Sequence, residues 1–451
     1  MAWAFGKSFL IALFLTPIVR DIFRAYNIVD RPGLRKVHAY PIPRLGGISI
    51  AAAFLIGLAG VLDADSLAWK LLPGAGVIFA TGVLDDFFNL PPRLKLVGQV
   101  LAACVAFWSG FRVPGPLPVS FVLTIGWLLL TTNAFNLVDG LDGLCAGLAF
   151  IATATMFAAG FFGSGIPALQ LATLPLAGAL LGFLFHNFNR ATMFLGDSGA
   201  LLIGFLEGCY GLLWAENVES PVSMLAPVLA VSIPLLEVSV SIARRFIQQQ
   251  PIFAADRRHM HHRLLDRGLT RRRSVVMLYL WAASGAILAL LLGYPELGGV
   301  PRLAVLGIFC VTTWAGIRQL RYPEFEVAGG LLIRGDFQRA MQSKMRVQNL
   351  AEALRQAKTE DEWWDSLAGA ARDAGWAGAQ WLTKDSVRRE QVFGEALATW
   401  SFQIVLGGEE TLRVDGTLPF AETPLDLLGF AEAVRKSFAL RQGTWVRAQL
   451  S

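Results

Sequence analysis

Long apolar runs separated by short polar loops recur along the first 320 residues. A window of about 19 residues, enough to cross a bilayer, finds apolar spans near 4–19, 46–62, 68–84, 96–111, 119–136, 144–163, 167–186, 199–215, 224–243, 274–293 and 302–319. The pattern predicts an all-α polytopic membrane protein with about eleven transmembrane helices. Pro17 and Arg20 follow the first span where a signal-peptide cleavage site would need small residues, so we expect this helix to stay uncleaved.

The pattern changes abruptly after the last span. A helical stretch is followed by the strand-like pieces "AGAQWL", "ATWSFQIVL" and "ETLRVDG" and by a closing helix, "DLLGFAEAVRKSFAL". We therefore expect a transmembrane domain over 1–320 and a small α+β domain, GAF-like, over 321–451. This second domain contains no histidine and no cysteine. A regulatory or dimerising role is expected for it, with a plain stabilising appendage as the alternative.

Composition and charge agree with the apolar spans and orient them. Hydrophobic residues make up 54% of the chain and charged residues 16%, and the mean hydropathy of +0.51 is unlike that of a soluble enzyme. The loops of one side hold most of the lysine and arginine, while those of the other carry only Lys70, Arg112 and Arg302. By the positive-inside rule, the basic loops and the C-terminus are predicted to be cytoplasmic. The net charge of +5 follows from these loops and implies no nucleic acid.

The four cysteines give no sign of a structural framework. Cys104, Cys145, Cys209 and Cys310 fall in or beside apolar spans at unrelated spacings. This placement predicts reduced thiols, and it fits neither a set of disulfides nor a zinc site.

The first basic loop combines cations with turn-forming residues. In "RKVHAYPIPRLGG", Arg35, Lys36, His38 and Arg44 lie among prolines and glycines. Such a loop suits a phosphorylated ligand or anionic lipid headgroups. The alternative is an ordinary inside loop that binds nothing.

An acidic pair marks the inner end of the third span. Asp85 and Asp86 are adjacent in "VLDDFFNLPPRLK", and Lys95 follows shortly after. Adjacent helical residues point about 100° apart, so the two carboxylates need not share one ligand. One can bind a metal while the other acts as a base or fixes the lysine.

A run of amides and acids follows at the inner end of the fifth span. In "TTNAFNLVDGLDGL", Asn133, Asn136, Asp139 and Asp142 stand at i, i+3 steps. Such groups can recognise a nucleobase edge or a sugar. Hydrogen bonding between helices is the alternative, which explains one asparagine well and the two aspartates poorly.

Asp197 lies on a glycine turn just before an apolar helix, in "FLGDSGALLIG". A carboxylate there can simply cap the helix. In a site that handles a diphosphate, it is also a good Mg²⁺ ligand, because Mg²⁺ prefers few carboxylates together with substrate oxygens.

Three of the five histidines gather in the long basic loop before the tenth span. His259, His261 and His262 are followed by Arg263 in "HMHHR". Their spacing does not place all three on one helical face and no cysteine is near, which argues against zinc. A hydrogen-bonding clamp for phosphates or sugar hydroxyls fits better.

All of these strings fall on the predicted cytoplasmic side, so we expect them to build one site. A transporter is the non-enzyme alternative, since intramembrane acids and broken helices also form ion sites. It would place charges deep in several spans, whereas the acids of these strings cluster at the cytoplasmic ends.

In this order, "RLGG", "DDFFN" with its lysine, "NAFNLVDGLDG", "FLGDSG" and "HMHH" resemble the polyprenyl-phosphate N-acetylhexosamine-1-phosphate transferase superfamily over about residues 1–320. The histidine pattern followed by arginine is similar to that of bacterial UDP-GlcNAc:undecaprenyl-phosphate GlcNAc-1-phosphate transferases. The branch that transfers phospho-MurNAc-pentapeptide usually shows three consecutive histidines after a proline. That donor or another UDP-HexNAc is the alternative to UDP-GlcNAc.

The resemblance implies an enzyme of the bacterial inner membrane whose cytoplasmic site transfers GlcNAc-1-phosphate from UDP-GlcNAc to undecaprenyl phosphate. UMP is released in this first membrane step of a cell-envelope polysaccharide pathway, by direct attack or through an aspartyl-phosphate. The implied cofactor is Mg²⁺, with Mn²⁺ as the alternative ion, and a homodimer is left open.

The resemblance also implies roles for single residues. Asp197 would bind Mg²⁺, with Asp85, Asp86 and Lys95 on the lipid-phosphate and metal side. The nucleotide-sugar pocket would be lined by Asn136 and Asp139, with Asp142, Asn187 and Phe194 around the uracil, and the histidine cluster would contact the sugar phosphate. Two departures are His186, where aromatic residues are common, and Ala200, where serine is frequent. Neither removes a charged group, so activity is still expected.

Overall fold

The computed structural model divides into two compact units, residues 1–324 and 325–451. The residues described are 2–30, 41–59, 69–162, 165–218, 220–247, 259–320, 336–374, 376–384, 386–393, 400–407, 410–416 and 427–448.

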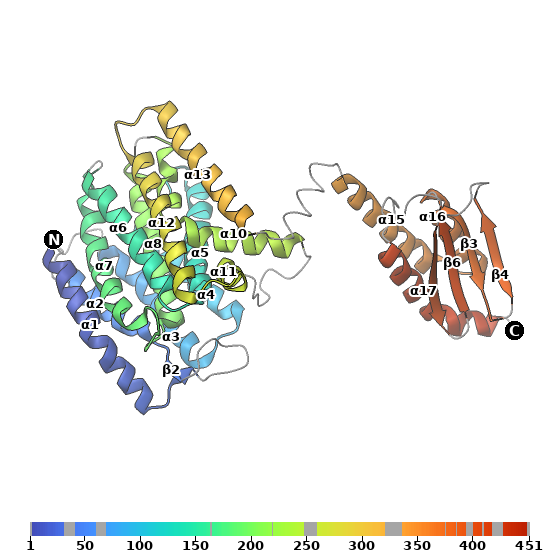
Figure 1. Cartoon of the computed structure of the whole chain (residues 1–451), viewed down its shortest axis with the longest axis horizontal. Coiled ribbons are helices and arrows are strands. Elements are labelled where there is room, and N and C mark those ends of the chain that lie inside the picture. Colours follow the sequence, from blue (N-terminus) through green and yellow to red (C-terminus); the bar gives the residue numbers. More distant parts are fainter. Residues whose placement is uncertain are drawn as a thin grey trace. The chain divides into compact units, whose positions relative to one another are not determined.

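The first unit is a bundle of helices (Figure 1). Its longer helices are α1 (Ala2–Ala25), α3 (Leu72–Phe88), α4 (Pro92–Trp108), α5 (Leu117–Val138), α6 (Leu144–Phe162), α7 (Pro167–Asn187), α8 (Gly196–Glu216), α10 (Ser232–Ile247), α12 (Arg271–Gly293) and α13 (Gly299–Gln319). Shorter elements are α2 (Gly46–Ala59), α9 (Ala226–Ala230), α11 (Met260–Asp266), the 3₁₀ turns η1 (Trp69–Leu71) and η2 (Ser223–Leu225), and the strands β1 (Val29–Asp30) and β2 (Ile42–Pro43). The two strands pair antiparallel.

Within the described residues, eight helices are long and apolar enough to cross a membrane. They are α1, α3 with η1, α5, α6, α7, α8, α12 and α13. A ninth span would be the helix pair 223–230 and 232–245, which is bent by 81°. Each predicted span falls on a helix or on this pair, but α2 with 14 residues and α4 with 17 are short for a bilayer. The multi-pass helical architecture is therefore confirmed, and the count of eleven stays a prediction.

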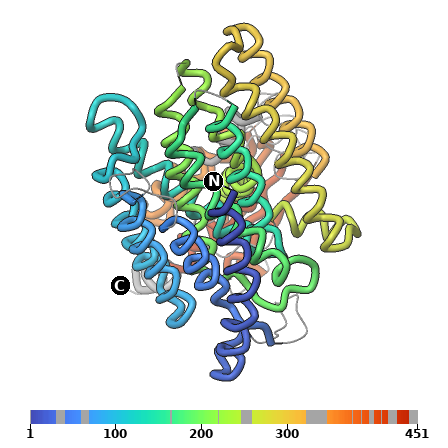
Figure 2. Tube along the Cα trace, turned by 90° about the vertical axis from the view of Figure 1, so that its left-hand side faces the viewer, coloured from blue at the N-terminus to red at the C-terminus, as the bar shows by residue number. Residues whose placement is uncertain are grey.

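Helix α8 forms the centre of the bundle. Of its apolar window 94% is buried inside the protein, against 6% for α13 at the periphery. Small residues let neighbours approach α8 closely, since a Cβ on Gly204 would lie 2.7 Å from the carbonyl oxygen of Thr131 on α5. The face of α1 that is turned to the viewer in Figure 2 is the outer one, because α1 packs against α2 and α7 behind it.

A histidine on α7 compensates for a proline in α1. Pro17 has no N–H and cannot donate to the carbonyl of Leu13, one helical turn earlier. The Nε2 atom of His186 lies 2.8 Å from that carbonyl oxygen. Because a carbonyl only accepts, Nε2 must carry the proton. His186 therefore donates a hydrogen bond here that a phenylalanine at this position could not donate.

We expect His186→Phe to lower the free energy of unfolding by about 1 kcal/mol, because it leaves the Leu13 carbonyl unpaired. The loss should be smaller when Pro17→Ala restores the backbone donor. Thermal unfolding of both single variants and the double variant in detergent measures this coupling. Equal losses in the two backgrounds would contradict the interpretation.

The second unit pairs helices with one antiparallel sheet. Its elements are α15 (Asp336–Gln356), α16 (Glu360–Asp373), β3 (Trp376–Leu382), β4 (Val387–Val392), β5 (Trp400–Gly407), β6 (Glu410–Gly416) and α17 (Leu427–Ala448). The strand order is β4-β3-β6-β5, with Trp381 opposite Leu412 and Leu412 opposite Ile404. The short connections agree with antiparallel neighbours.

The alternation of residues along these strands gives the sheet one apolar face. Trp381, Leu412 and Ile404 are buried in a core with Trp363 of α16 and Phe430 of α17. Their strand neighbours point to the opposite face, as period-2 geometry requires. This unit is thus of the α+β type, and the GAF-like assignment stays a prediction.

Candidate active site

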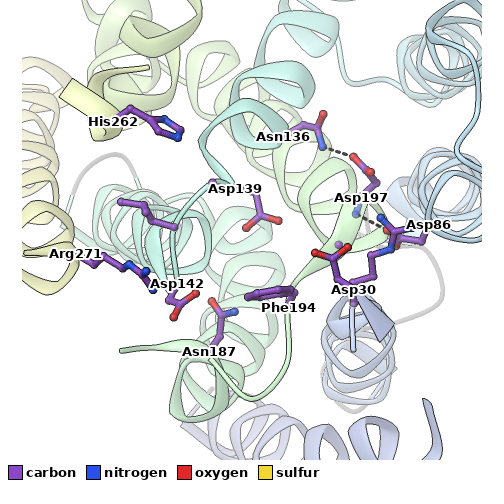
Figure 3. A pocket seen from close by; sticks show the side chains of 14 residues that line it. Asp30, Asp86, Asn136, Asp139, Asp142, Asn187, Phe194, Asp197, His262 and Arg271 are labelled. Atoms are coloured by element: carbon purple, nitrogen blue, oxygen red, sulfur yellow. Dashed lines mark hydrogen bonds between the residues drawn. The ribbon is translucent and has the colours of Figure 1, made fainter. Parts of the chain in front are cut away.

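A cavity of about 500 Å³ opens among residues from distant parts of the first unit (Figure 3). It is lined by Asp30, Arg44, Asp86, Asn136, Asp139, Gly140, Leu141, Asp142, Asn187, Phe194, Gly196, Asp197, His262 and Arg271. Aspartates outnumber arginines among these side chains. Such an excess of carboxylates disfavours an anionic substrate unless cations are bound with it.

Asp86 fixes the start of α8. Its Oδ1 accepts a hydrogen bond from the backbone N–H of Asp197 at 2.9 Å, and its Oδ2 accepts one from Ser198 at 2.9 Å. The turn before α8 needs glycine, because Gly196 has φ +75° and a Cβ there would lie 2.8 Å from Asp86 Oδ2. A carboxylate on the first N–H groups of a helix is favourable. Asp86 on α3 thereby sets the position of Asp197.

Asp85 points to a different set of partners. Its Oδ1 accepts from the backbone N–H of Leu90 at 2.7 Å, and its Oδ2 lies 2.7 Å from the Nζ of Lys95. The same ammonium is 2.6 Å from Asp197 Oδ1 and 3.4 Å from Asn136 Oδ1. Asn136 also donates from Nδ2 to Asp197. One ammonium thus lies between two carboxylates that belong to different helices.

Asn187 and Asp142 tie two loops together on the other side of the cavity (Figure 3). Asn187 accepts from Gly143 N–H at 3.0 Å and donates to the Met193 carbonyl at 2.9 Å. Asp142 Oδ2 accepts from Ala191 N–H at 3.0 Å. These bonds join the turn after α5 to the loop between α7 and α8, so both residues shape the cavity wall as well as lining it.

The first basic loop is joined to the loop before α8. Phe194 donates its N–H to the Pro43 carbonyl at 2.8 Å, and Gly46 donates to the Phe194 carbonyl at 2.9 Å. The backbone of Arg44 forms an isolated parallel β-bridge with Phe194, and its guanidinium donates to Asn89 Oδ1 at 3.4 Å. Arg44 therefore stands at the cavity wall. Arg35, Lys36 and His38, predicted for the same loop, lie outside the described residues.

The histidine cluster borders the cavity from α11. His262 lines it, and His261 is buried against the turn after α5, where a Cβ on Gly140 would lie 2.5 Å from His261 Nε2. Burial, followed by the nearby His262 and His259, lowers the pKa of His261 well below its usual value. His261 is therefore neutral at physiological pH. Arg263 lies on α11 outside the cavity lining.

Asn133 lies away from the cavity. It forms a reciprocal amide pair with Gln99 of α4, at 2.8 and 3.2 Å. Interhelical hydrogen bonding, the alternative for this run, describes Asn133, while Asn136, Asp139 and Asp142 reach the cavity. The predicted run of amides and acids thus has two roles, hydrogen bonding between helices for Asn133 and lining of the cavity for the other three residues.

Residues that sequence reasoning did not single out also line the cavity. Asp30 is the last residue of β1, and Arg271 is the first residue of α12. Arg271 was visible only as one of many inside cations, and Asp30 carried no local signal. Within the described residues, no three His, Cys, Asp or Glu side chains are grouped as ligands of one metal ion.

The chain is similar in sequence to known proteins. Residues 68–215, within the first unit, match the family model described as glycosyl transferase family 4. A protein of Bacillus subtilis strain 168, "Probable undecaprenyl-phosphate N-acetylglucosaminyl 1-phosphate transferase", is 35% identical over 61% of this chain and 80% of its own length.

Two further relatives carry related names. "Decaprenyl-phosphate N-acetylglucosaminephosphotransferase" of Mycobacterium tuberculosis H37Rv is 35% identical over 60% of this chain and 77% of its own length. "Undecaprenyl-phosphate alpha-N-acetylglucosaminyl 1-phosphate transferase" of Escherichia coli K12 is 29% identical, over 67% and 86% respectively.

The turn residue Asp139 should make stability depend on pH. Burial, with the carboxylates of Asp197, Asp86 and Asp142, raises the pKa of Asp139 from 3.8 to about 8. At a pH between these two pKa values, Asp139 therefore keeps its proton in the folded, cation-free protein and loses it in the unfolded chain. The contribution to stability is complete below the unfolded pKa and is lost as pH rises toward the folded pKa.

In chelator-treated protein, we expect Asp139→Asn to gain stability over the wild type as pH rises from about 5 to about 8, by at least about 1 kcal/mol. Thermal unfolding at several pH values measures the difference. Parallel pH profiles of variant and wild type would contradict this expectation.

Proposed function

Since the chain belongs to the polyprenyl-phosphate N-acetylhexosamine-1-phosphate transferase superfamily, we propose that it transfers GlcNAc-1-phosphate from UDP-GlcNAc to undecaprenyl phosphate. The protein is a multi-pass membrane phosphotransferase that acts on a polyprenyl phosphate. The names of the relatives support GlcNAc-1-phosphate as the group transferred. The finer choices of nucleotide donor and lipid length are part of the proposal.

The proposed reaction exchanges one phosphoanhydride for another. An oxygen of the lipid phosphate attacks the sugar-bearing β-phosphorus, a new P–O bond forms, and the bond to the UMP oxygen breaks. UMP leaves with the bonding electron pair, and the lipid diphosphate keeps the sugar. Because similar bonds are made and broken, the reaction should be nearly isoenergetic and reversible.

The ammonium between Asp85 and Asp197 is the observation that carries this proposal. Its distances of 2.7 and 2.6 Å mark a place where two carboxylates require a positive charge. Mg²⁺ fits such a place, since one or two carboxylates suffice when substrate phosphates and water supply the remaining ligands. Asp197, with Asp85, would hold the ion, which would neutralise charge on the phosphate oxygens.

Lys95 has a second task in this proposal. Its flexible side chain can leave the carboxylates and bind a phosphate oxygen as the reacting groups assemble. Asp86 keeps Asp197 in place through the backbone of α8, because both of its oxygens accept backbone N–H groups. Through the ion that it would share with Asp197, Asp85 would orient the lipid phosphate, which is already mostly anionic at neutral pH.

The opposite wall would recognise the nucleotide. Asp142 and Asn187 are held by loop backbone, so their remaining acceptor and donor capacity faces the cavity with little freedom. Phe194 offers a ring for a base, and Arg44 and Arg271 offer positive charge to phosphates. The inside cations support a cytoplasmic site in the bacterial inner membrane, where nucleotide sugars are available.

We expect Asp197→Asn to abolish the exchange of labelled UMP into UDP-GlcNAc, with a loss of at least about 1,000-fold, because the variant removes the charge that holds the ion. Asp21→Asn, an exposed acid on α1 paired with Arg20, is the matched control and should keep wild-type exchange. Both variants should show wild-type thermal unfolding within about 1 kcal/mol. Retained exchange in Asp197→Asn would overturn the assignment of the ion to this residue.

A panel of donors tests the substrate. Purified protein with undecaprenyl phosphate, Mg²⁺ or Mn²⁺, and one UDP-sugar at a time should release UMP fastest with UDP-GlcNAc. UDP-MurNAc-pentapeptide and other UDP-HexNAc donors are the alternatives, and preference for one of them would replace the proposed donor. Omission of both ions should stop the reaction. UMP exchange in the absence of lipid phosphate would indicate a two-step route through an aspartyl-phosphate.

A further inference from the structure

Glu237 is a buried acid that no step above uses. It lies on α10, the second half of the span that is bent by 81°, and its residue is 2% exposed. Figure 1 shows α10 running across the bundle beside α11. A carboxylate is costly to bury unless partners satisfy it. Its partners therefore indicate why it is there.

Among the described residues, its hydrogen-bond and ion-pair partners belong to the start of the histidine cluster. Glu237 Oε1 accepts the backbone N–H of Met260 at 2.7 Å and lies 3.1 Å from His259 Nδ1. Oε2 lies 4.0 Å from His261 Nδ1. The carboxylate thus accepts the N–H of Met260, 23 positions further along the chain, and lies close to the histidines on either side of it.

The histidines form a contiguous stack beyond this contact. The ring centroids of His259 and His261 are 5.5 Å apart, and those of His261 and His262 are 4.3 Å apart. His261 presses on Gly140, and His262 lines the cavity. A displacement at the Glu237 end would therefore be transmitted to the cavity wall, since packed rings cannot move independently.

We propose that Glu237 is the positioning residue of the histidine cluster, holding His259 and the Met260 backbone so that His261 packs against the turn after α5 and His262 meets the reacting phosphates. This inference rests on the proposed function, together with the contact to the sugar phosphate that the family resemblance implies for the cluster. Glu237 itself is not a catalytic residue, because it acts through the segment that it holds.

Three substitutions separate the charge from the shape. Glu237→Ala removes both contacts and should lower kcat for UMP release about tenfold, with a smaller change in KM for UDP-GlcNAc. Glu237→Gln keeps an oxygen for the Met260 N–H but loses the charge, so it should recover part of the loss. Glu237→Asp keeps the charge with a shorter reach and should recover less than Gln, because the Met260 contact is the one that positions the segment.

A buried carboxylate elsewhere provides the matched control. Glu207 on α8 is fully buried and accepts a hydrogen bond from Thr153 on α6, away from the histidines. Glu207→Gln should leave kcat unchanged. If Glu207→Gln lowers kcat as much as Glu237→Ala does, the effect is a general result of altering buried acids and the proposal is overturned.

Two readouts follow the mechanism directly. Hydrogen exchange of the Met260 amide should speed up about tenfold in Glu237→Ala and stay near wild type in Glu237→Gln. A double-mutant cycle of Glu237→Ala with His259→Ala should be non-additive, because the second change removes a contact that is already lost. Unchanged exchange of this amide, or additive losses in the cycle, would overturn the positioning role.

Failure of the proposed function would look different. It would appear as no UMP release by the wild-type protein from any UDP-HexNAc donor with undecaprenyl phosphate. Wild-type activity together with wild-type kcat in Glu237→Ala would instead overturn only the positioning role. The hydrogen-exchange experiment needs no substrate, so it tests the contact in either case.

Discussion

The two hydrogen bonds from the backbone at the start of α8 to the Asp86 carboxylate are the interaction on which the site depends. They join α3 to the central helix at the point where that helix meets the cavity. This junction sets the position of the Asp197 side chain, and with it the position of the Lys95 ammonium that Asp197 shares with Asp85. A buried carboxylate that accepts two backbone N–H groups is well satisfied, so the junction can be rigid without further support.

Most of the bundle could be predicted from the sequence, because composition alone decides which segments a bilayer accepts. Asp197 and Asn136 were also predictable as cavity residues, since each stands at one end of an apolar span. The position of Asn133 outside the cavity was not predictable. Each i, i+3 step on a helix turns a side chain by about 60°, so Asn133, one step before Asn136 on α5, faces α4. Asp86 carried a local signal for chemistry, but its capping of a helix 110 positions away did not.

Glu237 shows the same limit more sharply. In sequence it is a lone acid inside an apolar span, without any spacing that relates it to the histidines. Its meaning depends on the 81° bend between α9 and α10, which local periodicity does not encode. His186 is a related case, since its departure from an aromatic residue is explained only by Pro17 on another helix. Contacts between distant elements, rather than local propensities, account for what sequence reasoning missed.

The paired backbones at the start of α2 also limit how the protein can move. Gly46 and Gly47 donate to the carbonyls of Phe194 and Leu195, each at 2.9 Å, so the loop with Arg44 and the loop with Asp197 form one rigid body. Neither loop can swing away as a lid without breaking both bonds. A bulky donor that enters past these loops must therefore do so without either loop moving on its own.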